Sequence, residues 1–155
     1  MKNCIFCLIA KHEAWADILW EDKTHIAFLS IYPNTEGFSV VIPKFHQPSY
    51  VFACKDQVIT DLMIATKKTA KMIEVAYPDV ARCGVVFEGW GVNHLHTKLF
   101  PMHGTGSIKK WRKLSSAVDK YFTHYEGYIS SHDYKRARDS ELARVAEKIR
   151  QANKT

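Results

Sequence analysis

Two histidines and a lysine alternate with other residues late in the chain, at His94, His96 and Lys98. Alternation of this kind is typical of a β-strand, because successive side chains of a strand point to opposite faces. We therefore expect these three side chains to line one face, with Cα atoms about 6.5 Å apart from one to the next. A neutral imidazole is a nucleophile or base near pH 7, and an ammonium group attracts anions. The pattern predicts a site that reacts with an anionic ligand; the alternative is a solvated strand face.

Residues of the kinds that bind zinc form a second group. Cys4 and Cys7 make a Cys-x-x-Cys pair, whose thiolates can hold one zinc ion from a single turn of backbone. A tetrahedral site needs two more ligands, for which His46 and His94 are the best candidates. The alternatives are a redox dithiol, which lacks the surrounding thioredoxin-like pattern here, and two small buried side chains. If all four residues bind, no position is left for water, so the zinc would be structural.

The elements that must position these residues follow from hydrophobic periodicity and turn signals. Short apolar runs predict strands over residues 18–20, 24–31, 38–43, 81–87 and 95–100. Apolar residues at helical spacing predict a helix over residues 57–77, with Asp56 as its N-cap and Pro78 just past its end. A strand-rich chain with one long central helix indicates the α+β class.

The run Gly-Thr-Gly-Ser at residues 104–107 is the best boundary within the chain. Beyond it, apolar residues keep helical spacing over residues 111–125, although the aromatic end of this stretch could equally form a strand. A last helix is expected after Asp139 or Ser140, with an apolar face that covers core or a partner.

Size and charge limit the classes of function. The chain has 155 residues, which suits one domain, and a net charge of +6, which favours phosphate-bearing ligands. Its basic clusters are better explained as solvated helix faces than as a nucleic-acid interface. The apolar run near the N-terminus is too short for a secretory signal, and no stretch approaches the length of a membrane span. We therefore expect a cytoplasmic protein without disulfides and without membrane partners.

Several segments in order resemble the histidine triad (HIT) family. His94-Leu95-His96-Thr97-Lys98 and the apolar residues after it resemble the His-x-His-x-His signature. Residues 37–46 resemble the family's Gly-His-x-x-Val-Ile-Pro-Lys-x-His, and Cys-Ile-Phe-Cys at residues 4–7 resembles the opening of many bacterial members. Residues 20–29 and Glu88-Gly89 also match. The resemblance covers residues 3–103.

This resemblance implies an antiparallel sheet with helices packed against it, commonly paired into a homodimer. It implies structural Zn²⁺ on Cys4, Cys7, His46 and His94. It also makes His96 the nucleophile toward the α-phosphorus of a nucleotide, with His94 and Lys98 as its catalytic neighbours. The nucleotide-binding residues that it implies are Phe6, Ile9, Phe28, Ser30, Ile31, Asn93 and His103.

The chain departs from the family pattern around the phosphate. Lys98 stands at the third histidine position, Ser30 replaces the aspartate that holds the ribose, and Phe38 replaces a histidine. The loop over residues 87–93 lacks the family's Gly-Gln-Ser/Thr. Plain core packing is the alternative role for the apolar pocket residues, and ordinary loop positions are the alternative for Asn93 and His103.

We interpret residues 1–103 as a HIT-like nucleotide-binding domain, and residues 104–155 as a basic, largely helical extension packing on it. The expected activity is hydrolysis of dinucleoside polyphosphates or nucleoside phosphoramidates through a nucleotidyl-histidine. The rivals are a nucleotidyltransferase, favoured by the changed third position, and a non-catalytic nucleotide-binding module. The expected ligand is a purine nucleotide or a dinucleoside polyphosphate.

Overall fold

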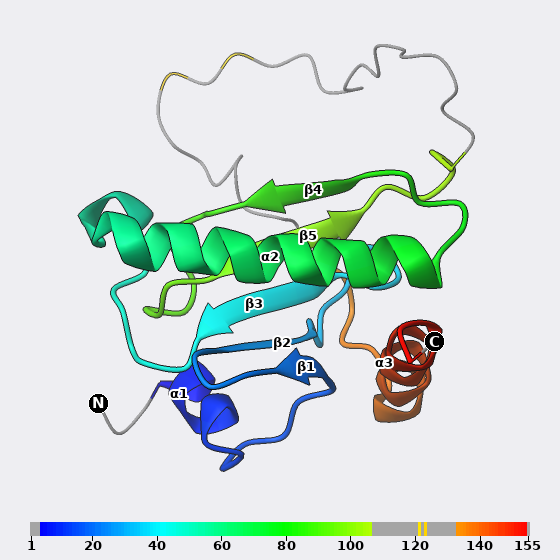
Figure 1. The fold of residues 1–155 in the computed structure, drawn as a ribbon, viewed down its shortest axis with the longest axis horizontal. Coiled ribbons are helices and arrows are strands. Elements are labelled where there is room, and N and C mark those ends of the chain that lie inside the picture. The colour runs from blue at the N-terminus through cyan, green and yellow to red at the C-terminus, as the bar shows by residue number, and fades with distance from the viewer. Residues whose placement is uncertain (1–3, 107–120, 122, 124–132, 155) are drawn as a thin grey trace.

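The computed structural model describes residues 4–106, 121, 123 and 133–154. In this part of the chain, one antiparallel five-stranded sheet has the strand order β1-β2-β3-β5-β4 (Figure 1). The strands are β1 (Ile18–Glu21), β2 (His25–Leu29), β3 (Ser39–Pro43), β4 (Cys83–Val86) and β5 (Thr97–Pro101). The predicted α+β class with an antiparallel sheet is confirmed.

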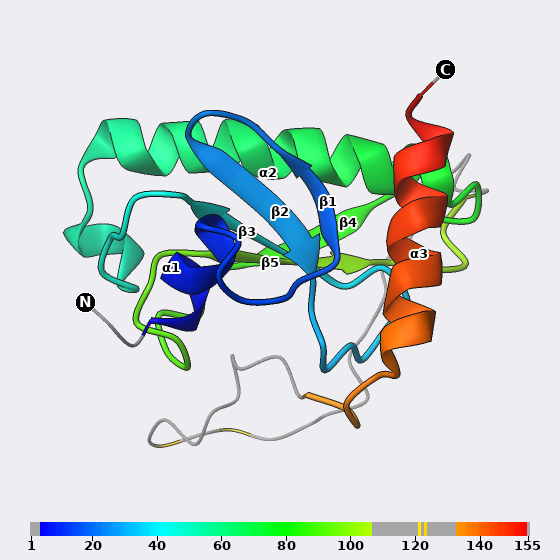
Figure 2. The ribbon, with the colours of Figure 1, turned by 90° about the horizontal axis from the view of Figure 1, so that it is seen from below.

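The described helices are α1 (Ile5–Ala10), the 3₁₀ turn η1 (Val51–Ala53), α2 (Asp56–Ala76) and α3 (Asp139–Ala152). The long helix α2 lies lengthwise over the sheet (Figure 1), and α3 crosses near one end of α2 (Figure 2). Not one of the helices described is both long enough and apolar enough to cross a membrane.

The two central strands β2 and β3 are buried along their whole length because helices cover both faces of the sheet. Alternate side chains enter two separate cores. Ala27, Leu29 and Val41 pack against α2 and α3. Phe28 and Val40, with their neighbours, pack against α1 and the segment that follows it. The second core lies beside the predicted site, so α1 is held at the edge of that site.

The α2 helix buries a stripe with helical spacing, as the sequence predicts, at Leu62, Ala65, Thr69, Ile73 and Ala76. Its start differs from the prediction. Lys55 is the N-cap and makes no side-chain capping bond, while Asp56 is the first helical residue. An acid in the first turn is still favourable there because of the positive end of the helix dipole.

The predicted strand over residues 95–100 begins later than expected. Ladder pairing with β3 starts where Thr97 faces Val41. The amide of Leu95 donates instead to the carbonyl of Gln47 (3.0 Å), and the amide of His94 donates to the carbonyl of Val92 (2.7 Å). The backbone before Thr97 therefore bends, and the expectation that His94 shares a strand face with His96 and Lys98 is wrong.

The last predicted helix is present as α3, and its apolar face (Leu142, Val145, Ala146, Ile149) packs into the core against α2 and β1. The predicted aromatic helix over residues 111–125 lies outside the described residues, apart from Tyr121 and Thr123. The proposed division into residues 1–103 and 104–155 stays a prediction.

Candidate active site and metal centre

Four potential metal ligands converge from three separate segments. Cys4 is the N-cap of α1 and Cys7 lies in its first turn, His46 follows β3, and His94 precedes β5. Their ligand atoms all lie within 4.8 Å of one another. The Cys7 Sγ atom is 3.3 Å from Nδ1 of His46 and 3.5 Å from Nδ1 of His94, and Cys4 Sγ is also 3.5 Å from Nδ1 of His94. These are close to the S···N edge of a tetrahedral zinc site, about 3.5 Å from the usual bond lengths.

The hydrogen bonding of His94 suits a metal ligand. Its Nε2 lies 2.8 Å from the carbonyl oxygen of Pro43, which can only accept, so Nε2 carries the proton. Burial lowers the pKa of His94, although the bond to Pro43 opposes this. The ring is therefore neutral, with the Nδ1 lone pair directed at the cysteines, and Pro43 is the outer partner that fixes this tautomer.

The surroundings of Cys7 disfavour its thiolate unless a cation is nearby. Burial raises the pKa of Cys7, and the hydrogen bond and charge of the neighbouring Cys4 raise it further. Two adjacent thiolates repel each other unless a positive ion lies between them. Two thiolates and two neutral imidazoles form a donor set that suits zinc, so the residues present fit the metal that the sequence predicts.

His96 is held by the same segment. Its Nδ1 lies 2.7 Å from the backbone carbonyl oxygen of His94, so Nδ1 carries the proton and Nε2 carries the lone pair. Burial lowers the pKa of His96; the bond to His94 opposes this, and the positive charge of Lys98 lowers the pKa further. His96 is thus a neutral imidazole at pH 7 in a fixed orientation, which is the form that can attack phosphorus.

His96 lines a pocket of about 600 Å³. This volume is within the range of small-molecule sites. The expected pocket residues that line it are Phe6, Ile9, Phe28, Ser30, Ile31, His96 and Lys98. The ring of Phe6 packs edge-on against both Phe28 and His96, with centroids 5.5 and 5.2 Å apart. The pocket therefore has an apolar wall for a flat ring and a nucleophile at one end.

From Thr97 onward, where β5 begins, side chains alternate between the two faces of the sheet as predicted. Thr97 is buried, and its hydroxyl oxygen lies 2.7 Å from that of Thr66 in α2. His96 and Lys98, on either side of Thr97, face the pocket. The predicted pairing of these two residues on one surface agrees with the structure, whereas His94 belongs to the metal cluster.

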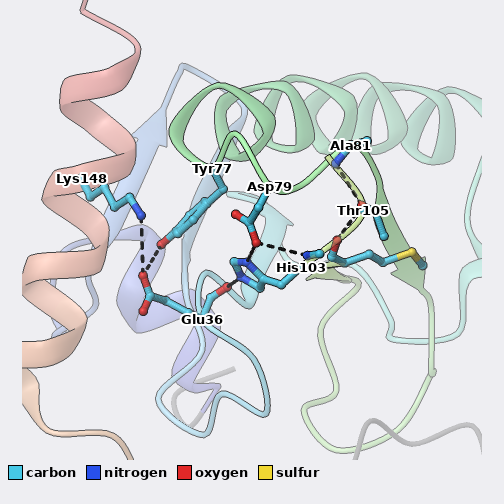
Figure 3. Close-up of polar contacts among 9 residues, drawn as sticks. Glu36, Tyr77, Asp79, Ala81, His103, Thr105 and Lys148 are labelled. Carbon is cyan, nitrogen blue, oxygen red and sulfur yellow. Dashed lines mark hydrogen bonds and ion pairs between the residues drawn. The ribbon is translucent and has the colours of Figure 1, made fainter. Parts of the chain in front are cut away.

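Two expected ligand contacts lie elsewhere. The side-chain oxygen of Asn93 accepts a hydrogen bond from the amide of Ser49 (3.2 Å), and Asn93 is not among the pocket residues. His103 lies past the end of β5, where it bridges Asp79 and the backbone of Glu36 (Figure 3). Neither residue is brought to His96 in this structure.

Lys98 has a buried partner that the sequence analysis did not assign. Its Nζ lies 2.7 Å from Oε1 of Glu88, and the two side chains are 15% and 6% exposed. Glu88 comes from the loop between β4 and β5 and also lines the pocket. Trp15, Tyr32 and Trp90 line the pocket as well. No periodic pattern could have found these residues, because they lie in irregular segments.

Comparison with known proteins identifies the family. A HIT domain model matches residues 11–105. The adenosine 5'-monophosphoramidase HNT1 of Saccharomyces cerevisiae is 33% identical over 119 residues, which are 76% of this chain and 75% of that protein. An uncharacterized HIT-like protein of Methanocaldococcus jannaschii is 30% identical over 130 residues, 80% of this chain and 99% of that protein.

A solved structure supports the fold. The hypothetical histidine triad nucleotide-binding protein from Sulfolobus tokodaii superposes with a TM-score of 0.69 at 21% identity, over 96% of this chain and 91% of that one. Because the family model covers more than half of the sequence and the fold agrees, this chain belongs to the HIT family.

Proposed function

We propose that this protein is a nucleotide hydrolase that acts through a nucleotidyl-histidine on His96 and releases a nucleoside monophosphate. The observation that carries the proposal is the geometry of His96. Its Nδ1 proton is bound to the His94 carbonyl, and its ring lines a pocket with an apolar wall. A neutral imidazole fixed in this way needs no strong base before it attacks phosphorus.

The substrates we propose are nucleoside phosphoramidates and dinucleoside polyphosphates. A relative that is 33% identical is an adenosine 5'-monophosphoramidase, which supports the first class. The base would lie against Phe6, Phe28 and Ile31, which gives contact area without base-specific hydrogen bonds. The hydroxyl of Ser30 would replace one contact to the ribose.

The reaction has two steps. The Nε2 lone pair of His96 forms a bond to the α-phosphorus as the bond from phosphorus to the leaving group breaks, and the leaving group departs with that electron pair. A polyphosphate leaves as the anion, whereas an amine also takes up a proton from solvent. Water then attacks the same phosphorus and releases a proton to solvent, while the phosphorus–Nε2 bond breaks with its electron pair returning to Nε2, so that His96 is again neutral. Both steps place charge on the phosphate oxygens beside Lys98, which stabilises that charge most strongly where water is excluded.

We also propose that zinc binds at Cys4, Cys7, His46 and His94. When bound, it supplies a structural crosslink between α1 and the segment before β5. The carbonyl of His94 orients His96, so an ordered His94 also orders the nucleophile. The proposed zinc ligands and the reacting Nε2 of His96 are thus linked through His94.

Turnover of a diadenosine polyphosphate and of adenosine 5'-phosphoramidate, each with and without added acceptor phosphates, tests the function. Release of AMP to water supports the hydrolase. Transfer of the nucleotide to the acceptor supports a transferase, which Lys98 at the third position favours as the second candidate. Binding of AMP with no turnover would contradict both and leave a non-catalytic module.

A matched pair of variants assigns the activity. His96→Ala should lower turnover by about a thousandfold or more while retaining AMP binding, since the nucleophile acts mainly in the transition state. His12→Asn is the control, because His12 is half-exposed on the surface outside the pocket. Asparagine tolerates the left-handed backbone of this position (φ 59°). A His96→Ala protein with nearly normal turnover would refute the mechanism.

A further inference from the structure

The pocket contains a carboxylate at a place where an anion is expected to bind. The side chain of Glu88 is only 6% exposed, and its Oε1 pairs with Nζ of Lys98 at 2.7 Å. Its other oxygen, Oε2, is buried and has no hydrogen-bond partner among the described residues. A buried acceptor without a donor is unfavourable, and more so when it carries a charge. Something that enters the pocket is therefore expected to satisfy it.

The backbone at Gly91, in the loop between β4 and β5, lies close to this carboxylate. A Cβ atom at Gly91 would lie 3.3 Å from Oε1 of Glu88, and Gly91 has a φ of +80°, which favours glycine. Gly91 and Val92 line the same pocket as Glu88 and His96. The position of Glu88 is thus set by backbone on one side and by Lys98 on the other.

The ion pair of Glu88 and Lys98 changes which ligand charge the pocket favours. Glu88 compensates much of the charge of Lys98, so the region beside His96 attracts a second phosphate less than a free lysine would. A negatively charged group placed next to Oε2 would be repelled, and the repulsion is strong where water is excluded. An N–H group in the same place would instead donate a hydrogen bond to a charged acceptor, which is one of the stronger kinds.

We propose that Glu88 contacts the substrate and determines specificity, by accepting a hydrogen bond from nitrogen attached to the phosphorus at His96. It selects nucleoside phosphoramidates, whose leaving group is an amine, over dinucleoside polyphosphates, whose leaving group is an anion. This inference rests on the proposed function and narrows its substrate class.

Calorimetric binding to the His96→Ala protein, which cannot turn the ligands over, tests this selectivity. The ligands are AMP, adenosine 5'-phosphoramidate, which carries an N–H donor on phosphorus, and ADP, which carries a phosphate there. With Glu88 intact, the phosphoramidate should bind about tenfold more tightly than ADP. Equal affinities for the phosphoramidate and ADP, or tighter binding of ADP, would overturn the proposal. This comparison needs no substitution at Glu88.

Adding Glu88→Gln to this protein keeps the shape of the side chain and removes its charge. The ratio of phosphoramidate to ADP affinity should then fall by about tenfold. Glu74→Gln is the matched control, because Glu74 pairs with Lys71 on α2 outside the pocket; it should leave the ratio unchanged. If AMP binds and Glu88→Gln leaves the ratio unchanged, the specificity role is wrong while the proposed function stands. If none of the three ligands binds, the nucleotide pocket and the proposed function fail together.

Discussion

At the scale of single residues, His94 and His96 differ in which ring nitrogen carries the proton. His94 donates from Nε2 to Pro43 and turns Nδ1 toward the cysteines. His96 donates from Nδ1 to the carbonyl of His94 and keeps the lone pair on Nε2. The same residue type thus serves as a metal ligand and as a nucleophile because each ring has a different backbone acceptor.

The buried pair of Lys98 and Glu88 gives a prediction about stability. Lys98→Met leaves Glu88 buried without its cation, so it should lower the free energy of unfolding by about 3 kcal/mol. It should also slow turnover more than it weakens binding, because a negative charge then remains beside the developing charge on phosphate. The double variant Lys98→Met with Glu88→Gln should recover most of the lost stability. Denaturant unfolding checks both values, and an unchanged stability in Lys98→Met would show that the pair is not formed.

At this scale, the sequence predicts the role of a residue when that residue lies in a short motif, and not when the role depends on contacts that only the fold creates. The four metal ligands and His96 lie in motifs, so their types and order pointed to their roles. Glu88 belongs to a segment that resembles the family, but its pairing with Lys98 depends on the register in which Val86 of β4 faces Lys98 of β5. His103 follows the triad closely along the chain, yet β5 carries it to the opposite end of the strand, away from His96.

At the scale of elements, the metal cluster joins α1 to two other segments, the one just after β3 and the one just before β5. The helix α1 has only six residues and no side-chain cap, so it has little stability of its own. Phe6 and Ile9, which line the pocket, lie on this helix. Order in the pocket should therefore depend on the cluster.

Metal analysis should find about one zinc per chain, consistent with a single four-ligand site. Removal by a chelator should lower the melting temperature and weaken AMP binding, because α1 loses its crosslink. Cys4→Ser should abolish zinc binding, while Cys54→Ser, at a free thiol outside the cluster, should not. Protein purified without chelator that contains no metal, and whose Cys4 and Cys7 thiols titrate freely, would contradict the assignment.

A second cluster joins elements at the other end of β5 (Figure 3). His103 lies 2.9 Å from Oδ2 of Asp79 through Nδ1, and 3.0 Å from the carbonyl oxygen of Glu36 through Nε2. Both partners accept hydrogen bonds, so both nitrogens donate only when the ring is protonated. Burial lowers the pKa of His103, but the bonds to Glu36 and Asp79 outweigh it and raise the pKa above its usual value.

This bridge should make stability depend on pH. Because the folded-state pKa of His103 is raised, its contribution is fully present below the unfolded value of about 6.5 and is lost as pH rises through the folded value. The gain in melting temperature of the natural protein over His103→Gln should shrink between pH 6 and pH 8. In a protein that carries Asp79→Asn, the gain in melting temperature that His103 gives over glutamine should likewise be smaller. A difference in melting temperature that is constant with pH would mean that His103 is not protonated in the fold.

At the scale of the whole molecule, apolar side chains are exposed at one edge of the sheet and on α2, among the residues that the structure describes. The strand β4 is an edge strand, and Val85 on it is 42% exposed. On α2, Ile64 and Val75 are 63% and 57% exposed. Ile64 lies near Trp20 and His25, on the side of the sheet away from β4. An exposed strand edge and exposed apolar side chains on a helix are each typical of a surface that a partner covers.

We therefore expect a homodimer. Light scattering should give twice the chain mass of 17.8 kDa. Ile64→Glu should shift the protein toward the monomer mass, because it puts a charge where an exposed apolar side chain would be buried by the partner. A monomer mass for the natural protein at every practical concentration would refute the dimer.

The architecture was largely predictable because the strand and helix periods are strong. Both central strands and α2 occur within a few residues of the predicted ranges. The exceptions have local causes. The start of β5 depends on where the ladder with β3 begins, and the N-cap of α2 depends on backbone geometry that Lys55 adopts without a capping side chain. The pocket itself combines α1, the β2–β3 region and the loop before β5, so only the folded chain shows its full lining.

The central claim is that His96 carries the nucleotide. The direct measurement mixes the protein briefly with adenosine 5'-phosphoramidate or a diadenosine polyphosphate, and stops the reaction in alkaline denaturant, since phosphorus–nitrogen bonds hydrolyse in acid. Peptide mass spectrometry then locates any attached nucleotidyl group. We predict a nucleotidyl group on the peptide with His96, localised to that residue and absent from His96→Ala. Full turnover with no nucleotidyl group on His96 at any reaction time, or with the group on a different residue, would contradict the account.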